Sequence, residues 1–153
     1  MTEETTMFAL DDFETEDVAR MQIFPPGKFV AIGWIDFAGP GHPKTKQIAD
    51  EASRKRLFEE RQKQSNNRWK PEDKSPDQVD REYARMVADR IVGWSIKGRV
   101  KHEDTGEESI AEITYTHDTA MEMFLDRRKG WLYGQCAEFL ATVENFMPAS
   151  ARS

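Results

Sequence analysis

Cysteine is nearly absent from this sequence, and so is any long apolar run. The single cysteine, Cys136, excludes an internal disulfide and is typical of a protein in a reducing cytoplasm. No apolar run approaches the roughly 20 residues that a membrane-spanning helix needs. The first 17 residues, MTEETTMFALDDFETED, are acidic and lack the basic segment of a signal peptide. We therefore expect a cytoplasmic protein that does not bind membranes.

The residue patterns of catalytic and metal sites are also missing. Ser95 follows Gly93, but Lys97 occupies the position where a nucleophile elbow needs glycine. Carboxylates are plentiful, yet no pair is set apart for acid–base chemistry. The nitrogen and sulfur side chains that could bind a metal are scattered, without ligand spacing: His42, His102, His117 and Cys136. We predict no catalytic residue, no cofactor, no metal site and no enzymatic activity.

A glycine- and proline-rich stretch from Gly39 to Pro43 precedes Lys44, which is the order of parts in a phosphate-binding loop. That loop needs glycine directly before the lysine and another five residues earlier, where this chain has Pro43 and Ala38. Proline has no N–H to donate to phosphate. The dinucleotide fingerprint also fails, because Lys44 replaces its third glycine. We interpret the stretch as a rigid turn from strand to helix, formed by Gly39, Pro40, Gly41 and Pro43.

Charged and aromatic residues are abundant by contrast. Charged residues make up 33% of the 153-residue chain, and the formal net charge is −6, which repels nucleic acid and anionic membranes. Four Trp and nine Phe can anchor a core, because each aromatic side chain buries a large area. The length suits a single domain.

Turn residues between apolar runs indicate two β-hairpins. The runs 18–24 and 28–37 flank the sequence PPGK, and a second hairpin is expected to turn at Asp104–Gly106. In the stretch 29–37 both alternating sets of residues are fairly apolar. This strand is therefore expected to be covered on both faces or to pair with a partner.

Helical spacing and caps predict four helices. Ser75 and Gln78 form a capping box, and Thr116 can cap a short helix. The expected helices are Thr45 to about Gln64, Pro76 to Trp94, Thr116 to Leu125, and Trp131 to about Phe146. The predicted fold class is α+β, with a small N-terminal β-hairpin or sheet followed by a mainly helical C-terminal part.

The predicted organisation is a single domain with short flanking segments. Residues 1–17 are expected to be a mobile acidic segment, and 18–147 the domain, with a polar linker near 65–76. Residues 148–153 are a tail. The first helix and this linker carry basic residues around Trp69, a composition that can bind nucleic acid. Interleaved acidic residues and the negative net charge argue against that function.

Three stretches resemble a known family. The sequence WIDFAGPGHPKT before a charged helix, then RIVGWS, then LDRRKGWLYGQCAEFLATVENF, are similar to small tail assembly chaperone-like proteins of long-tailed bacteriophages and prophages. Those proteins pair a short β N-terminal part with a helical C-terminal part. They tend to carry Gly-Trp near the end of a central helix. The resemblance covers about residues 18–147, although the segment 97–112 is particular to this chain.

The resemblance implies a non-enzymatic protein of the host bacterial cytoplasm. Such chaperones coat the long, helical tape measure protein, keep it soluble and help bring tail tube subunits to it. Many copies could shield its apolar stripes through helix-in-groove contacts, and a homo-oligomer is compatible with this. For each candidate contact alone, packing in the core is the favoured interpretation. The candidates are Trp94, Met121, Phe124, Leu125, Trp131, Leu132 and Phe139.

Two other functions stay open. One is a structural virion protein, a tail or head–tail component retained in the particle, which could add its 29–37 strand to a neighbour. The other is a nucleic-acid-binding regulatory module using residues 54–70, whose binding would weaken steeply with salt.

Overall fold

The computed structural model describes residues 8–65 and 73–151, and in these residues four strands form one antiparallel sheet. The order across the sheet is β1-β2-β3-β4, the same as along the chain. The strands are β1 (Val18–Ile23), β2 (Gly33–Ala38), β3 (Ile91–Lys101) and β4 (Glu108–Glu112). The protein is thus α+β as predicted, but half of its sheet comes from strands that follow the second helix.

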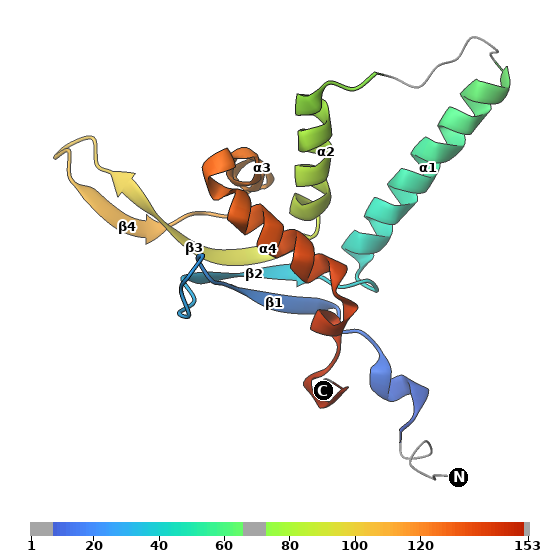
Figure 1. Ribbon diagram of the computed structural model, residues 1–153, viewed down its shortest axis with the longest axis horizontal. Coiled ribbons are helices and arrows are strands. Elements are labelled where there is room, and N and C mark those ends of the chain that lie inside the picture. The colour runs from blue at the N-terminus through green and yellow to red at the C-terminus, as the bar shows by residue number, and fades with distance from the viewer. Residues whose placement is uncertain (1–7, 66–72, 152–153) are drawn as a thin grey trace.

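Three helices cover one face of the sheet (Figure 1). They are α2 (Pro76–Ala88), α3 (His117–Leu125) and α4 (Gly130–Ala141). Alternate residues of β1 turn toward them: Ala19, Met21 and Ile23 are buried, while Arg20 and Gln22 are exposed. The core between helices and sheet also contains Ile35, Phe37, Ile91, Ala84, Val87, Ala88, Ala120, Met123 and Cys136.

The opposite face of the sheet is more open. Arg20 lies 3.6 Å above the centre of the Trp34 ring, and its Nε is 2.9 Å from an oxygen of Asp36. The expectation that the second strand is covered on both faces is therefore wrong, because the described helices pack on one face only. That strand also begins later than predicted, at Gly33. Phe29 lies in the connecting loop, where its side chain is 96% exposed.

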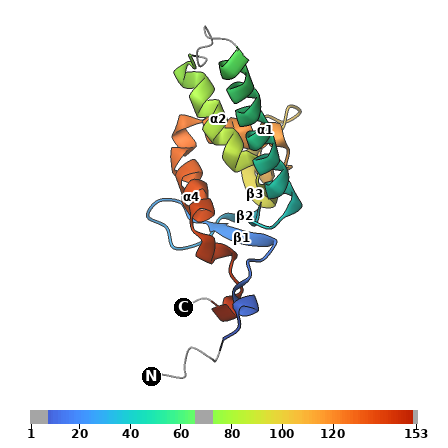
Figure 2. The ribbon, with the colours of Figure 1, turned by 90° about the vertical axis from the view of Figure 1, so that its right-hand side faces the viewer.

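The remaining long helix, α1 (Pro43–Ser65), projects from the body of the protein and has no buried residue. Figures 1 and 2 show it starting beside the sheet and extending away from it, and Figure 1 shows it diverging from α2. Two hydrogen bonds fix its base: Thr45 Oγ1 donates to the Gly39 carbonyl oxygen at 2.7 Å, and Lys44 Nζ donates to the Ile91 carbonyl oxygen at 2.6 Å. The predicted turn from strand to helix is confirmed.

The helix expected to run to Trp94 ends at Ala88 instead, and β3 begins after two intervening residues. A β-bulge explains the error. Phe37 pairs with Ile91 and Asp36 with Gly93, so one extra residue of β3 lies between these pairs. Ile91 and Trp94 consequently both face the core although they are three residues apart, a spacing that is also typical of a helix.

The predicted caps and the second turn are confirmed. Gln78 N–H donates to Ser75 Oγ, and Thr119 N–H donates to Thr116 Oγ1 at 3.0 Å. Gly106, with φ of +71°, lies in the β3–β4 connection. The last helix ends at Ala141, earlier than predicted, and the short 3₁₀ helix η4 (Val143–Phe146) continues the chain.

The chain segments at either end of the domain meet near β1. The short helix η2 (Leu10–Phe13) belongs to the acidic N-terminal segment, and the Phe8 and Phe13 rings contact each other. The Glu16 N–H donates to the carbonyl oxygen of Phe146 at 2.7 Å. Two further short helices are η3 (Arg127–Lys129) and η5 (Ala149–Ala151). Most of the predicted 65–76 linker lies outside the described residues.

Candidate protein-binding groove

Two surface hollows lie side by side between α2 and α4, because Tyr83 of α2 and Tyr133 of α4 line both of them. The first has a volume of about 310 Å³ and reaches Leu125 at the end of α3. The second has a volume of about 330 Å³ and reaches Ile48 on α1. We call the two together the α2–α4 groove.

The groove follows one side of α4 from its first residue to its last turn. Gly130 and Tyr133 line the first hollow, and Tyr133, Ala137 and Leu140 line the second. These residues are three or four positions apart and so share one face of the helix. The core-facing residues of the same helix, Leu132 among them, lie on another face. Twelve residues of α4 correspond to a groove about 18 Å long at 1.5 Å per residue.

The wall formed by α2 presents large apolar side chains to solvent. Tyr83 is 56% exposed and Met86 is 63% exposed, whereas the small residues Ala84 and Ala88 are buried against the sheet and its helices. Small residues on the buried side let α2 approach its neighbours closely, which leaves the large ones on the groove side. In the sequence, Tyr83 and Met86 share the helical spacing of the buried Val87, so spacing alone does not show that they face solvent. The small residues Ala84 and Ala88 mark the side of α2 that faces the core, and this is the signal that could have placed Tyr83 and Met86 on the other side.

Charges in the two hollows differ. The first is lined by Asp80, Asp126 and Arg127. Asp126 accepts a hydrogen bond from the Arg128 N–H, which lowers the pKa of its carboxyl group, and Lys129 lies nearby. The second hollow contains one charged residue, Arg90. Burial lowers the pKa of the Arg90 guanidinium.

The candidate contacts predicted from the sequence divide into three groups. Phe124 and Leu125 line the first hollow, although Phe124 is only 6% exposed. Trp94 and Leu132 are buried in the core, and Trp94 Nε1 donates to the Ile113 carbonyl oxygen at 2.8 Å. The other three are partly buried and pack against the core: Met121, Trp131 and Phe139. Whether any of them contacts a partner stays a prediction.

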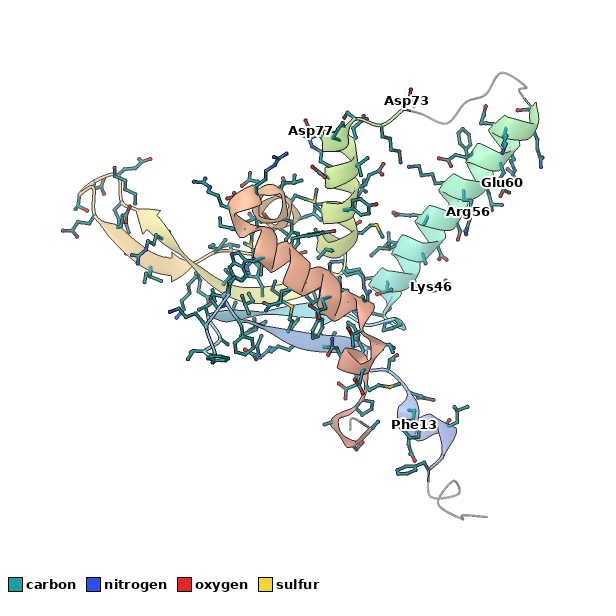
Figure 3. The ribbon with its side chains drawn as sticks, viewed as in Figure 1. Phe13, Lys46, Arg56, Glu60, Asp73 and Asp77 are labelled. Carbon is teal, nitrogen blue, oxygen red and sulfur yellow. The ribbon has the colours of Figure 1, made fainter. Side chains whose placement is uncertain are left out.

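The other candidate binding features predicted from the sequence lie apart from the groove. Lys46, Arg56 and Glu60 project from α1, so both signs of charge are displayed along it (Figure 3). Trp69, the aromatic residue proposed to stack on a base, lies outside the described residues. Only residues 33–37 of the predicted 29–37 strand belong to β2, which is a central strand that pairs with both β1 and β3. Its backbone is therefore already hydrogen-bonded on both sides and has no free edge for a neighbour's strand.

The possible metal ligands and the cysteine do not assemble into a site in the described part of the chain. No group of three or more His, Cys, Asp or Glu side chains lies together there in an arrangement that could hold a metal ion. His117 Nε2 instead lies 2.8 Å from Asp89 Oδ1. Cys136 is buried, and burial raises the pKa of its thiol to about 12. Within residues 8–65 and 73–151, no helix has both the length and the apolar character needed to cross a membrane.

No protein-family model, curated protein or solved structure matches this chain.

Proposed function

We propose that this protein is a non-enzymatic phage tail assembly chaperone that acts in the host bacterial cytoplasm. In this proposal it binds amphipathic helical segments of the tape measure protein, keeps that protein soluble and helps assemble the tail tube around it. The observation that carries the proposal is the α2–α4 groove, which is open, largely apolar and about as long as α4.

The dimensions of the groove support a helical partner. A length of about 18 Å accommodates roughly three turns of an α-helix. An amphipathic helix places apolar side chains at positions i, i+3, i+4 and i+7 along such a stretch. Tyr83, Met86 and Leu140 would contact that stripe from two sides. Exposed aromatic and methionine side chains of this kind are enriched at protein-binding surfaces.

The surface charge supports the proposed role in solubility. A chaperone that covers apolar stripes leaves its own outer surface to keep the complex in solution. The net charge of −6 provides mutual repulsion between complexes.

The proposal is tested by co-expressing variants of this protein with each long, helical protein of its genomic neighbourhood, as candidates for the tape measure protein. The variant Tyr83→Gln/Met86→Gln removes two apolar side chains from the groove while keeping good helix-forming residues. Each anchor is worth about 1–2 kcal/mol, so we expect at least a tenfold loss of affinity. The matched control is Leu57→Gln/Phe58→Gln on α1, where the original side chains are 54% and 62% exposed, close to the 56% and 63% of the first pair.

Three results would decide the matter. Loss of the soluble tape measure protein with the groove variant, and not with the α1 control, supports the proposal. A loss with the α1 variant and not with the groove variant would move the contact to α1. Finding the chain in purified particles at fixed stoichiometry would overturn the chaperone role and favour the structural virion protein.

A further inference from the structure

Arg90 is a charged residue in the otherwise apolar second hollow of the groove, and it has no charged partner among the described residues. It lies between α2 and β3, where Nε and Nη2 both donate to the carbonyl oxygen of Ala38, at 3.1 and 2.6 Å. Its guanidinium carbon is 5.4 Å from the centre of the Phe146 ring. These contacts hold the side chain in place against the end of β2.

The neighbouring carboxylate is engaged elsewhere. Asp89 lies 2.8 Å from His117 Nε2 and 3.5 Å from Arg85 Nε. The residues that line the second hollow with Arg90 include Ile48, Met86 and Leu140, and no Asp or Glu. No ion pair of Arg90 within 4.0 Å is found in the described part of the chain. Arg90, which lines the second hollow, therefore carries a positive charge that no carboxylate of residues 8–65 or 73–151 pairs with.

A partly buried guanidinium without a carboxylate is unfavourable, because it gives up water without gaining an opposite charge. Arginine has five N–H donors in a planar fork, and a single carbonyl oxygen uses one edge of it. The edge that contains Nη1 makes no hydrogen bond to the described residues. A carboxylate that entered the hollow could bind that edge with two parallel hydrogen bonds.

We propose that the α2–α4 groove selects a helix that carries a glutamate or aspartate within its apolar stripe, and that Arg90 binds this carboxylate. This inference rests on the proposed function, since it describes the partner of the same groove. It adds a requirement that an apolar groove alone would not impose. Helices that are apolar throughout the stripe, or that carry lysine there, bind less well because Arg90 then stays unpaired or is repelled.

Because the chain is acidic overall, the preference for an acidic residue is confined to the surroundings of Arg90. A net charge of −6 repels acidic partners at a distance, so general acidity does not favour binding. An acidic residue contributes only when it reaches the second hollow, next to Arg90. The pairing consequently fixes the register of the partner helix along the groove as well as its identity.

The test uses synthetic amphipathic peptides of about 18 residues, long enough to form helix when stabilised. One peptide has an all-leucine stripe. The others place a single Glu, Gln or Lys at each stripe position in turn, so that the unknown register is covered. Binding to the full-length protein is measured by fluorescence anisotropy. At one stripe position we expect the Glu peptide to bind about tenfold more tightly than the Gln peptide, the size expected for a hydrogen-bonded charge pair.

Variants of the protein then test whether Arg90 causes the preference for Glu over Gln. Arg90→Met should remove the preference for Glu over Gln, whereas Arg81→Met, which removes an exposed arginine from the neighbouring helix α2, should keep it. Arg90→Lys should retain a reduced preference, because it keeps the charge and loses the planar fork. Circular dichroism checks that each variant folds. The comparison of Glu and Gln peptides on the unmodified protein holds even if Arg90→Met does not fold.

The outcomes separate this inference from the proposed function. If the peptides bind and Glu shows no advantage over Gln at any stripe position, the role of Arg90 is overturned and the groove remains a binding site. A Glu advantage that survives in Arg90→Met also overturns it. If no peptide binds, the groove is not a helix-binding site, and both proposals fail.

Discussion

Replacing Phe146 with alanine should lower the free energy of unfolding by about 3–5 kcal/mol. The Phe146 ring is 1% exposed, and it contacts the Phe139 ring at a centroid distance of 5.5 Å. A buried phenylalanine removes roughly 150–200 Å² from water, which is worth about 4–5 kcal/mol at 25 cal/mol per Å². The position close to the end of the chain allows some relaxation, which places the expected loss at the lower end of this range.

The measurement is urea unfolding followed by tryptophan fluorescence. With a slope of about 2 kcal/mol per M, the midpoint should fall by roughly 1.5 M. The control is Val143→Ala, at the other end of the same 3₁₀ helix, where the side chain is 56% exposed and the expected change is below about 0.5 kcal/mol. If the free energies of unfolding of the two variants differ by less than about 1 kcal/mol, η4 does not complete the core and the reasoning is refuted.

Three further predictions concern stability and reactivity. Gly39→Ala should lower the free energy of unfolding by about 1–3 kcal/mol, because the added Cβ would overlap the Glu16 carbonyl oxygen. The control Gly41→Ala should leave the thermal midpoint unchanged, because its Cβ would meet no atom within 4 Å. Ser75→Ala should cost about 1 kcal/mol in urea unfolding through loss of the cap on α2; an unchanged midpoint would contradict the capping role. Cys136 should resist a thiol reagent at pH 8 until the protein unfolds, and fast labelling of the native protein would show that the thiol is accessible. Because burial raises the pKa of this thiol to about 12, only the unfolded chain ionises it between about pH 9 and 12, so the free energy of unfolding should decline as the pH rises through this range.

Local signals in the sequence were sufficient for the elements whose ends are fixed by a few neighbouring residues. Ser75 and Thr116 begin their helices as predicted, since a cap depends only on the next three residues. The turn at Asp104–Gly106 is likewise set by its own glycine, which adopts a positive φ. These features need no knowledge of the tertiary fold.

Elements that depend on distant pairing could not be read in the same way. Ile91 and Trp94 carry a spacing that fits a helix, and only the bulge opposite Phe37 makes that spacing compatible with a strand. Phe29 continues the alternation of β2 in sequence, but pairing with β1 and β3 begins only at Gly33. In both cases the register of neighbouring strands decides the outcome, and register is a property of the assembled sheet.

The groove was hidden from the sequence for a related reason. The exposed residues Tyr83 and Met86 belong to the same apolar pattern as the buried Val87, and the pattern does not say which of them faces the sheet. Arg90 gave no signal either, since an arginine after a helix is ordinarily a solvated side chain. Its place in the groove follows from its hydrogen bonds to Ala38, which is 52 residues earlier in the chain.

The same hydrogen bonds connect the proposed recognition to the fold. Arg90 is held against the last residue of β2 and beside the buried Phe146 ring, so its charge is positioned by the sheet and the core. A partner would therefore meet a charge that is already in place, which reduces the ordering cost of binding. Because α4 and α2 are themselves packed on that sheet, the apolar walls of the second hollow and the charge of Arg90 keep a fixed spacing. A groove of this kind can distinguish helices by the position of one acidic residue, although most of its contact area is apolar and accepts many sequences.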